Sequence, residues 1–135
     1  MELFKTLEDR IIYVETLTSI ATSGEKITES QKMVVYNILK NYGIPEEYAS
    51  RIWSKVQKKY SIEEILQPME ALDPNIKLLL VQELVMIFLV SGKYKDEKAK
   101  LLQICKMLNI NIKLEAIKEH VTNALKEMEQ NKTKA

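Results

Sequence analysis

The amino-acid sequence predicts an all-α fold, a compact bundle of about seven helices, and three observations lead to that prediction. Apolar residues recur at three- and four-residue steps along almost the whole chain, which is the period of an amphipathic helix. Capping patterns precede two of these runs, at Thr28–Gln31 and Ser61–Glu64. No stretch shows the two-residue alternation of a strand between hairpin turns. With 135 residues, 46% of them apolar, we expect one domain over residues 1–130 and a disordered polar tail at 131–135.

Three helices are expected in the first half of the chain. The first ends near Gly24, since glycine tolerates the left-handed backbone of a helix end. The second begins at the Thr28 capping box and ends at Gly43. Pro45 suits the first turn of the third helix, where two glutamates favour the positive end of the helix dipole. The apolar stripe of the first helix consists of Leu3, Leu7, Ile11, Val14 and Leu17.

The second half of the chain contains the most apolar helix. Ser61 opens a short helix that Pro68 interrupts. Asp73 as a cap and Pro74 at the first helical position then begin a long helix that reaches about Val90. Because this helix is apolar on most sides, we expect it to be the central and most buried element.

Two further helices follow Gly92. One is expected over residues 96–108, with Leu102 and Cys105 on its apolar stripe, and Asn111 caps the last one. Most methionines fall on apolar stripes, so we expect them in the core. Trp53 is either a core residue or an exposed anchor for a partner, and its spacing with Ile52 and Val56 favours the core.

Composition excludes several classes of function. A net charge of +1 argues against a strongly basic nucleic-acid-binding domain. Lysines cluster at residues 55–59 and 93–100, but acidic neighbours dilute the second group, so we interpret both as solvated faces and expect no nucleic-acid partner. One cysteine and one histidine exclude a disulfide framework and a multi-thiolate zinc site.

No motif for catalysis is present in the sequence. His120 has no nucleophile or orienting carboxylate that the sequence nominates, and Cys105 is expected in the core. The three glycines lie too far apart to form a phosphate-binding loop. We therefore expect no enzymatic activity and no cofactor.

The sequence also carries a prediction of location. Acidic residues interrupt the first ten positions, where a secretion signal would be apolar. The most apolar run, residues 78–90, would span roughly 20 Å, short of the ~30 Å hydrocarbon core of a bilayer. A cytoplasmic protein without membrane insertion is expected.

Self-similarity relates the two halves of the chain. Ser23-Gly24 and a helix closing at Tyr42-Gly43-Ile44 have counterparts in Ser91-Gly92 and a helix closing at Leu108-Asn109-Ile110. The second copy is two residues shorter. This pattern favours an internal duplication with pseudo-twofold symmetry, although helical hairpins with glycine turns can produce a similar spacing.

In these stretches the chain resembles the TerB-like superfamily, which is named for tellurite-resistance proteins. The Asp73-Pro74 pair before a leucine-rich helix strengthens the resemblance, which covers roughly residues 5–128. It implies an all-helical domain of two similar halves. By fold-level analogy it also implies a stress-associated role.

The resemblance further implies divalent-cation binding by aspartates that precede the loop glycines. In this chain those positions are Ser23 and Ser91, so both carboxylates are missing. The remaining acids near the two loops, and hence the candidate metal ligands, are Glu25, Glu29, Asp96 and Glu97. The same acids would also be favoured at helix N-termini by the helix dipole alone.

Two functional hypotheses follow. The first is a non-enzymatic cytoplasmic module of the TerB-like type that binds or scaffolds a protein partner, with a homodimer possible in principle. The alternative is a domain that binds or senses a divalent cation through the acids near the Ser-Gly loops. An exposed apolar patch would favour the first hypothesis, and convergence of the four acids would favour the second.

Overall fold

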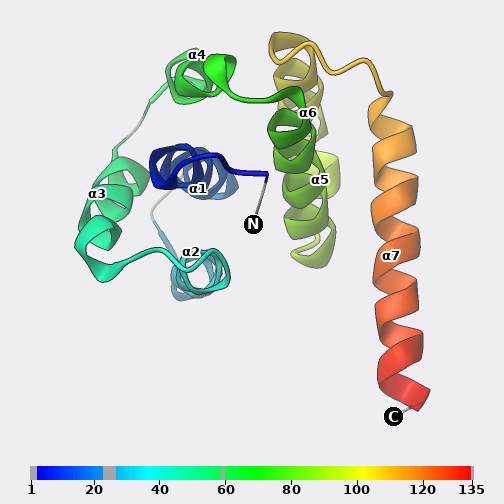
Figure 1. Cartoon of the computed structure of the whole chain (residues 1–135). Helices are drawn as coiled ribbons and strands as arrows, with labels where there is room; N and C mark the ends of the chain where they lie inside the picture. The colour runs from blue at the N-terminus through cyan, green and yellow to red at the C-terminus, as the bar shows by residue number, and fades with distance from the viewer. Residues whose placement is uncertain (1–2, 23–26, 59, 135) are drawn as a thin grey trace. The chain divides into compact units, whose positions relative to one another are not determined.

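The computed structural model describes residues 3–22, 27–58 and 60–134, and this part of the chain is all-helical, with no strand (Figure 1). The all-α class is therefore confirmed. The elements are α1 (Leu7–Ala21), α2 (Glu29–Asn41), α3 (Glu46–Gln57), α4 (Ile62–Leu66), the 3-10 helix η1 (Gln67–Ala71), α5 (Pro74–Val90), α6 (Tyr94–Met107) and α7 (Leu114–Lys134).

Local capping chemistry sets several helix starts as the sequence predicts. The Thr28 hydroxyl accepts from the Gln31 amide at 3.2 Å, and the Gln31 side chain accepts from the Thr28 amide at 3.0 Å. Ser61 and Glu64 form the same reciprocal pair before α4. Asp73 Oδ1 accepts from the amide of Asn75 at 2.8 Å at the start of α5.

Three helix starts differ from what the sequence pattern suggests. The first helix begins at Leu7, because the Thr6 hydroxyl caps it by accepting from the Asp9 amide at 3.0 Å. The sixth begins at Tyr94, two residues before the expected position. The last begins at Leu114 and not after Asn111, since the first carbonyl to accept from the helix is that of Lys113. The predicted end of the first helix at Gly24 lies outside the described residues.

Three helices end in the same left-handed turn. Gly43, Gly92 and Asn109 have φ angles of 59°, 74° and 57°. After Gly43, the amide of Ile44 donates to the Leu39 carbonyl at 3.0 Å, and after Asn109 the amide of Ile110 donates to the Cys105 carbonyl at 2.9 Å. These are the bonds of a Schellman cap, which uses glycine or asparagine at the left-handed position.

The chain divides into two compact units, Met1–Lys77 and Leu78–Ala135, with the division inside α5. Helix α7 continues to Lys134, past residue 130. The single domain over residues 1–130 and the tail at 131–135 stay predictions.

Helix α1 is the centre of the first unit. It contacts α2, α3, α4 and η1, and Figure 1 shows it among them. Every side chain from Tyr13 to Ile20 is buried. The expectation that α5 would be the most buried helix is therefore wrong, since Met86 and Val90 of α5 are exposed. Hydropathy does not identify α1 as the central buried helix, because its buried stretch includes a glutamate, two threonines and a serine.

The buried threonines of α1 are satisfied by their own helix. The Thr16 hydroxyl donates to the Ile12 carbonyl at 2.9 Å, and that of Thr18 donates to the Val14 carbonyl at 2.7 Å. Such bonds to the preceding turn remove the penalty for burying a hydroxyl. Polar residues can therefore occupy the core of this unit without partners from other helices.

Glu15 is the buried charge of α1, and α3 neutralises it. Its Oε2 lies 2.6 Å from Lys55 Nζ, and its Oε1 forms an ion pair with Arg51 Nε. Arg51 also donates from Nη2 to Glu8 Oε1 at 2.9 Å. This hydrogen bond lowers the pKa of Glu8 and raises that of Arg51. Two turns of α1 are thereby tied to one face of α3.

An aromatic cluster closes the other side of α1. Phe4, Tyr13 and Tyr42 have ring centroids between 5.3 and 6.0 Å apart, with tilted and edge-on geometries. Phe4 is buried although it precedes the helix. The apolar residue Phe4 is therefore buried from the segment before α1, and its burial does not need the helix to begin earlier.

The second unit contains most of α5 together with α6 and α7. Leu101, Ile104 and Cys105 form the buried face of α6, and burial raises the pKa of the Cys105 thiol. The core position of Cys105 is confirmed. Leu102, expected on the same stripe, is 50% exposed, so that expectation is wrong.

The left-handed turn at Asn109 gives a first testable prediction. Replacing Asn109 with alanine should lower the free energy of unfolding by about 1 kcal/mol, because a Cβ without a polar group is disfavoured at positive φ. Asn109→Gly should stay within about 0.5 kcal/mol of the wild type. Urea unfolding monitored by circular dichroism measures both, and an alanine variant as stable as the glycine variant would contradict the assignment.

The Glu15 ion pairs predict an asymmetry of costs. The double variant Arg51→Met with Lys55→Met leaves a buried carboxylate without cations and should cost about 3–5 kcal/mol. Glu15→Met should cost only about 1–2 kcal/mol, since Arg51 and Lys55 are 40% and 41% exposed and can turn to water. Chemical denaturation measures the free energy of unfolding of the two variants. An equal loss in both would contradict a stabilising role for the ion pairs.

Candidate functional site

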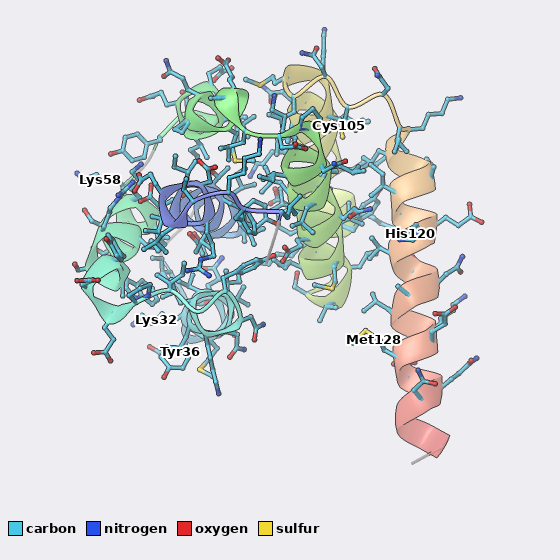
Figure 2. The ribbon with its side chains drawn as sticks, viewed as in Figure 1. Lys32, Tyr36, Lys58, Cys105, His120 and Met128 are labelled. Carbon is cyan, nitrogen blue, oxygen red and sulfur yellow. The ribbon has the colours of Figure 1, made fainter. Side chains whose placement is uncertain are left out.

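A groove between α5 and α7 is the candidate site of the second unit. Its volume is about 160 Å³, and most of its lining is apolar. Residues at helical spacing on each helix face it, so that α7 contributes two turns and α5 little more than one. His120 and Met128, both labelled on α7 in Figure 2, mark its extent along that helix. The lining residues are Gln82, Glu83, Met86, His120, Val121, Ala124, Leu125 and Met128.

The apolar stripe of α7 continues beyond the part that is covered. Leu114, Ile117 and Val121 are buried, whereas Met128 on the same stripe is 56% exposed. The periodicity of the sequence identifies this face correctly, but it does not reveal where the covering ends. The result is an exposed apolar surface on a helix that is anchored at its other end.

Methionine burial is a correction to the sequence analysis. Met69 is buried as expected, but Met33, Met86 and Met128 are exposed. Two of these three exposed methionines line the groove. Their flexible, polarizable side chains suit a surface that adapts to different shapes. Trp53, expected in the core, is half-buried.

Charged contacts with α6 hold the beginning of α7. Lys98 Nζ lies 3.0 Å from Glu115 Oε1, and Lys118 Nζ lies 4.8 Å from the centre of the Tyr94 ring. The hydrogen bond with Lys98 lowers the pKa of Glu115, and the same bond raises the pKa of Lys98. Burial raises the pKa of Tyr94, and the Glu115 charge adds to the effect. These contacts position the helix that carries most of the groove.

His120 lies at the groove and is exposed. Among the described residues that line the groove, none is a serine, threonine or cysteine that the imidazole could activate as a nucleophile. The chemistry that this groove offers is apolar contact with one imidazole and one carboxylate at its edge. The absence of enzymatic activity stays a prediction.

The candidate metal ligands do not form a cluster in the described part of the chain. Glu25 lies outside the described residues. Glu29 pairs with Lys32 at 3.1 Å, and Glu97 pairs with Lys100 at 2.8 Å. Asp96 is exposed in the first turn of α6. Among residues 3–22, 27–58 and 60–134, no group of three or more His, Cys, Asp or Glu could share a metal ion. A cation at Glu29 or Glu97 would have to compete with a lysine.

Comparisons with known proteins find no match: no family model, no curated protein and no solved structure matches this chain. Within the described residues, no helix is both long enough and apolar enough to cross a bilayer. The cytoplasmic location stays a prediction.

The Lys98–Glu115 pair predicts a pH-dependent coupling between α6 and α7. The pKa of Glu115 is lowered in the folded state, so its contribution is present above the ordinary carboxyl value of 4.5 and is lost as the pH falls through the folded value. A double-mutant cycle with Lys98→Met and Glu115→Gln should therefore show a favourable coupling near neutral pH and none at about pH 2. Both groups are exposed, so added salt should reduce the coupling. A coupling that persists in acid would contradict this account.

Proposed function

We propose that this chain is a non-enzymatic, TerB-like binding module that recruits a protein partner through the groove between α5 and α7. The carrying observation is the exposed apolar stripe of α7, which runs from the buried Val121 to the exposed Met128 beside Met86 of α5. A surface of this kind is costly in water and is typical of interaction sites.

The dimensions of the groove favour a helical segment of the partner. From Val121 to Met128 the helix rises by about 10 Å, which corresponds to two turns. A helix that docks in such a groove places apolar anchors at positions i, i+3 or i+4, and i+7. The accessible apolar side chains that the partner would meet on α7 include Ala124, Leu125 and Met128, and the first two lie four and three residues before Met128.

The TerB-like part of the proposal is supported by the repeated helix ends. Gly43 and Asn109 occupy equivalent places in the two halves of the sequence, and both adopt the same left-handed cap with the same pair of hydrogen bonds. Gly92 shares this cap, so the argument depends on the order of the motifs along the chain and not on the cap alone. A stress-associated role follows from analogy with the family only.

A helical probe peptide tests the proposal. A fluorescent amphipathic peptide of about 18 leucine and lysine residues, with leucine at i, i+3, i+4 and i+7, should bind the wild-type chain in an anisotropy titration. Met128→Lys should weaken binding at least about tenfold, because a buried methionine contributes about 1.5–3 kcal/mol. Met33→Lys is the matched control, since Met33 is 58% exposed, lies in the other unit and should leave the affinity unchanged.

Two results would contradict this function. Equal binding to the wild type and to Met128→Lys would place the peptide elsewhere, as would equal binding of a sequence-scrambled peptide. Sedimentation equilibrium checks the occupant: a wild-type dimer that becomes monomeric on Met128→Lys would show that a second copy, and not a separate partner, covers the groove.

A further inference from the structure

Two thioether side chains face the groove between α5 and α7, one from each helix. Met86 of α5 is 36% exposed, Met128 of α7 is 56% exposed, and both line the groove. Figure 2 shows the Met128 side chain on the side of α7 that faces α5. Both side chains belong to the surface that a partner would cover, so a chemical change at either sulfur alters that surface directly.

Burial separates these two sulfurs from the others of the second unit. An oxidant must reach a sulfur before it can react, and Met107 is half-buried. Cys105 is buried, and this burial raises the pKa of its thiol, so the reactive thiolate is disfavoured. In the first unit, Met69 is fully buried. A peroxide in solution therefore meets Met86 and Met128 before these three residues.

Oxidation of a thioether to a sulfoxide makes this part of the groove polar. The sulfoxide oxygen accepts hydrogen bonds from water, and an apolar side chain of a partner cannot replace them. The neighbouring side chains on α7, Ala124 and Leu125, are apolar and have no donor to offer. Covering the oxidised groove therefore costs the free energy of stripping water from the sulfoxide.

The contacts that hold α7 in place contain no methionine. Glu115 pairs with Lys98, and Lys118 lies over the Tyr94 ring, both near the beginning of the helix. From Glu115 to Met128 the helix rises by about 20 Å. Oxidation at Met128 therefore changes the binding surface and leaves the anchor of the helix intact.

We propose that Met86 and Met128 form an oxidation site through which a hydroperoxide lowers the affinity of the groove for its partner. Each thioether sulfur attacks one oxygen of the peroxide, so that an S–O bond forms while the O–O bond breaks. The sulfur loses two electrons, and the departing oxygen takes up the proton of the transferred hydroxyl group, leaving as water or an alcohol. The inference rests on the proposed function, because it concerns the regulation of the same groove.

The experiment treats the folded full chain with hydrogen peroxide, removes the peroxide, and follows two readouts. Peptide mapping by mass spectrometry should find sulfoxide at Met86 and Met128 before Met69 is changed. In the anisotropy titration, the leucine and lysine probe peptide should bind the oxidised chain at least about tenfold more weakly. The two methionine sulfoxide reductases, one for each epimer, with dithiothreitol as the electron donor should restore the affinity.

Leucine variants assign the effect to the groove. The double variant Met86→Leu with Met128→Leu keeps a similar apolar volume and has no sulfur there, so it should bind the probe equally before and after peroxide. Met33→Leu is the matched control, since it removes an exposed methionine of the first unit. This variant should lose affinity on oxidation as the wild type does.

The proposed function and this inference fail in different ways. If the untreated chain does not bind the probe, the proposed function falls and the inference falls with it. If the untreated chain binds, the inference alone is overturned by any of three results: unchanged affinity after oxidation, an equal loss in the double leucine variant, or oxidation of Met69 as fast as that of Met86 and Met128.

Discussion

The burial of one carboxylate on a helix packed on several sides determines much of the first unit. A charge in that position destabilises the fold unless cations accompany it into the interior. Arg51 and Lys55 are one helical turn apart on α3, so both reach Glu15 only when that face of α3 lies against α1. Arg51 also binds Glu8, two turns earlier on α1. These pairs hold one face of α3 against α1.

Helix ends could be predicted from the sequence, because their causes lie within a few residues. The capping boxes at Thr28 and Ser61 and the left-handed turns at Gly43 and Gly92 all depend on local hydrogen bonds and local sterics. Where a local pattern had two solutions, the prediction failed. Asn111 has the chemistry of a cap, yet the turn at Asn109 is followed by an extra loop before α7 begins.

Burial was harder to predict, because it depends on residues far apart in the chain. The hydropathy of α5 exceeds that of α1, yet α1 is the more continuously buried helix. The threonines of α1 donate to carbonyls of their own helix, and its glutamate pairs with cations from α3. The presence of these polar residues therefore does not mean that the helix is exposed. For the same reason the candidate metal ligands could not be judged from the sequence: whether Glu29 and Glu97 face lysines is decided by side-chain geometry. The periodicity of α7 predicted which face of the helix is apolar, but it did not predict that Met128 on this face is exposed.

The two units differ in how completely their helices are covered by neighbouring helices. In the first unit, α1 has neighbours on several sides, and the space left beside its one buried charge is small and polar. In the second unit, α7 is anchored near its beginning by Lys98 and Tyr94, and its apolar stripe extends beyond that anchor. A helix held firmly at one end can present an uncovered face without losing its position, since the anchoring contacts do not depend on the partner. That separation of anchor and exposed stripe is what makes α7 suited to recognition: binding covers apolar surface on a helix that is already ordered, and the entropic cost of forming the helix falls on folding and not on binding.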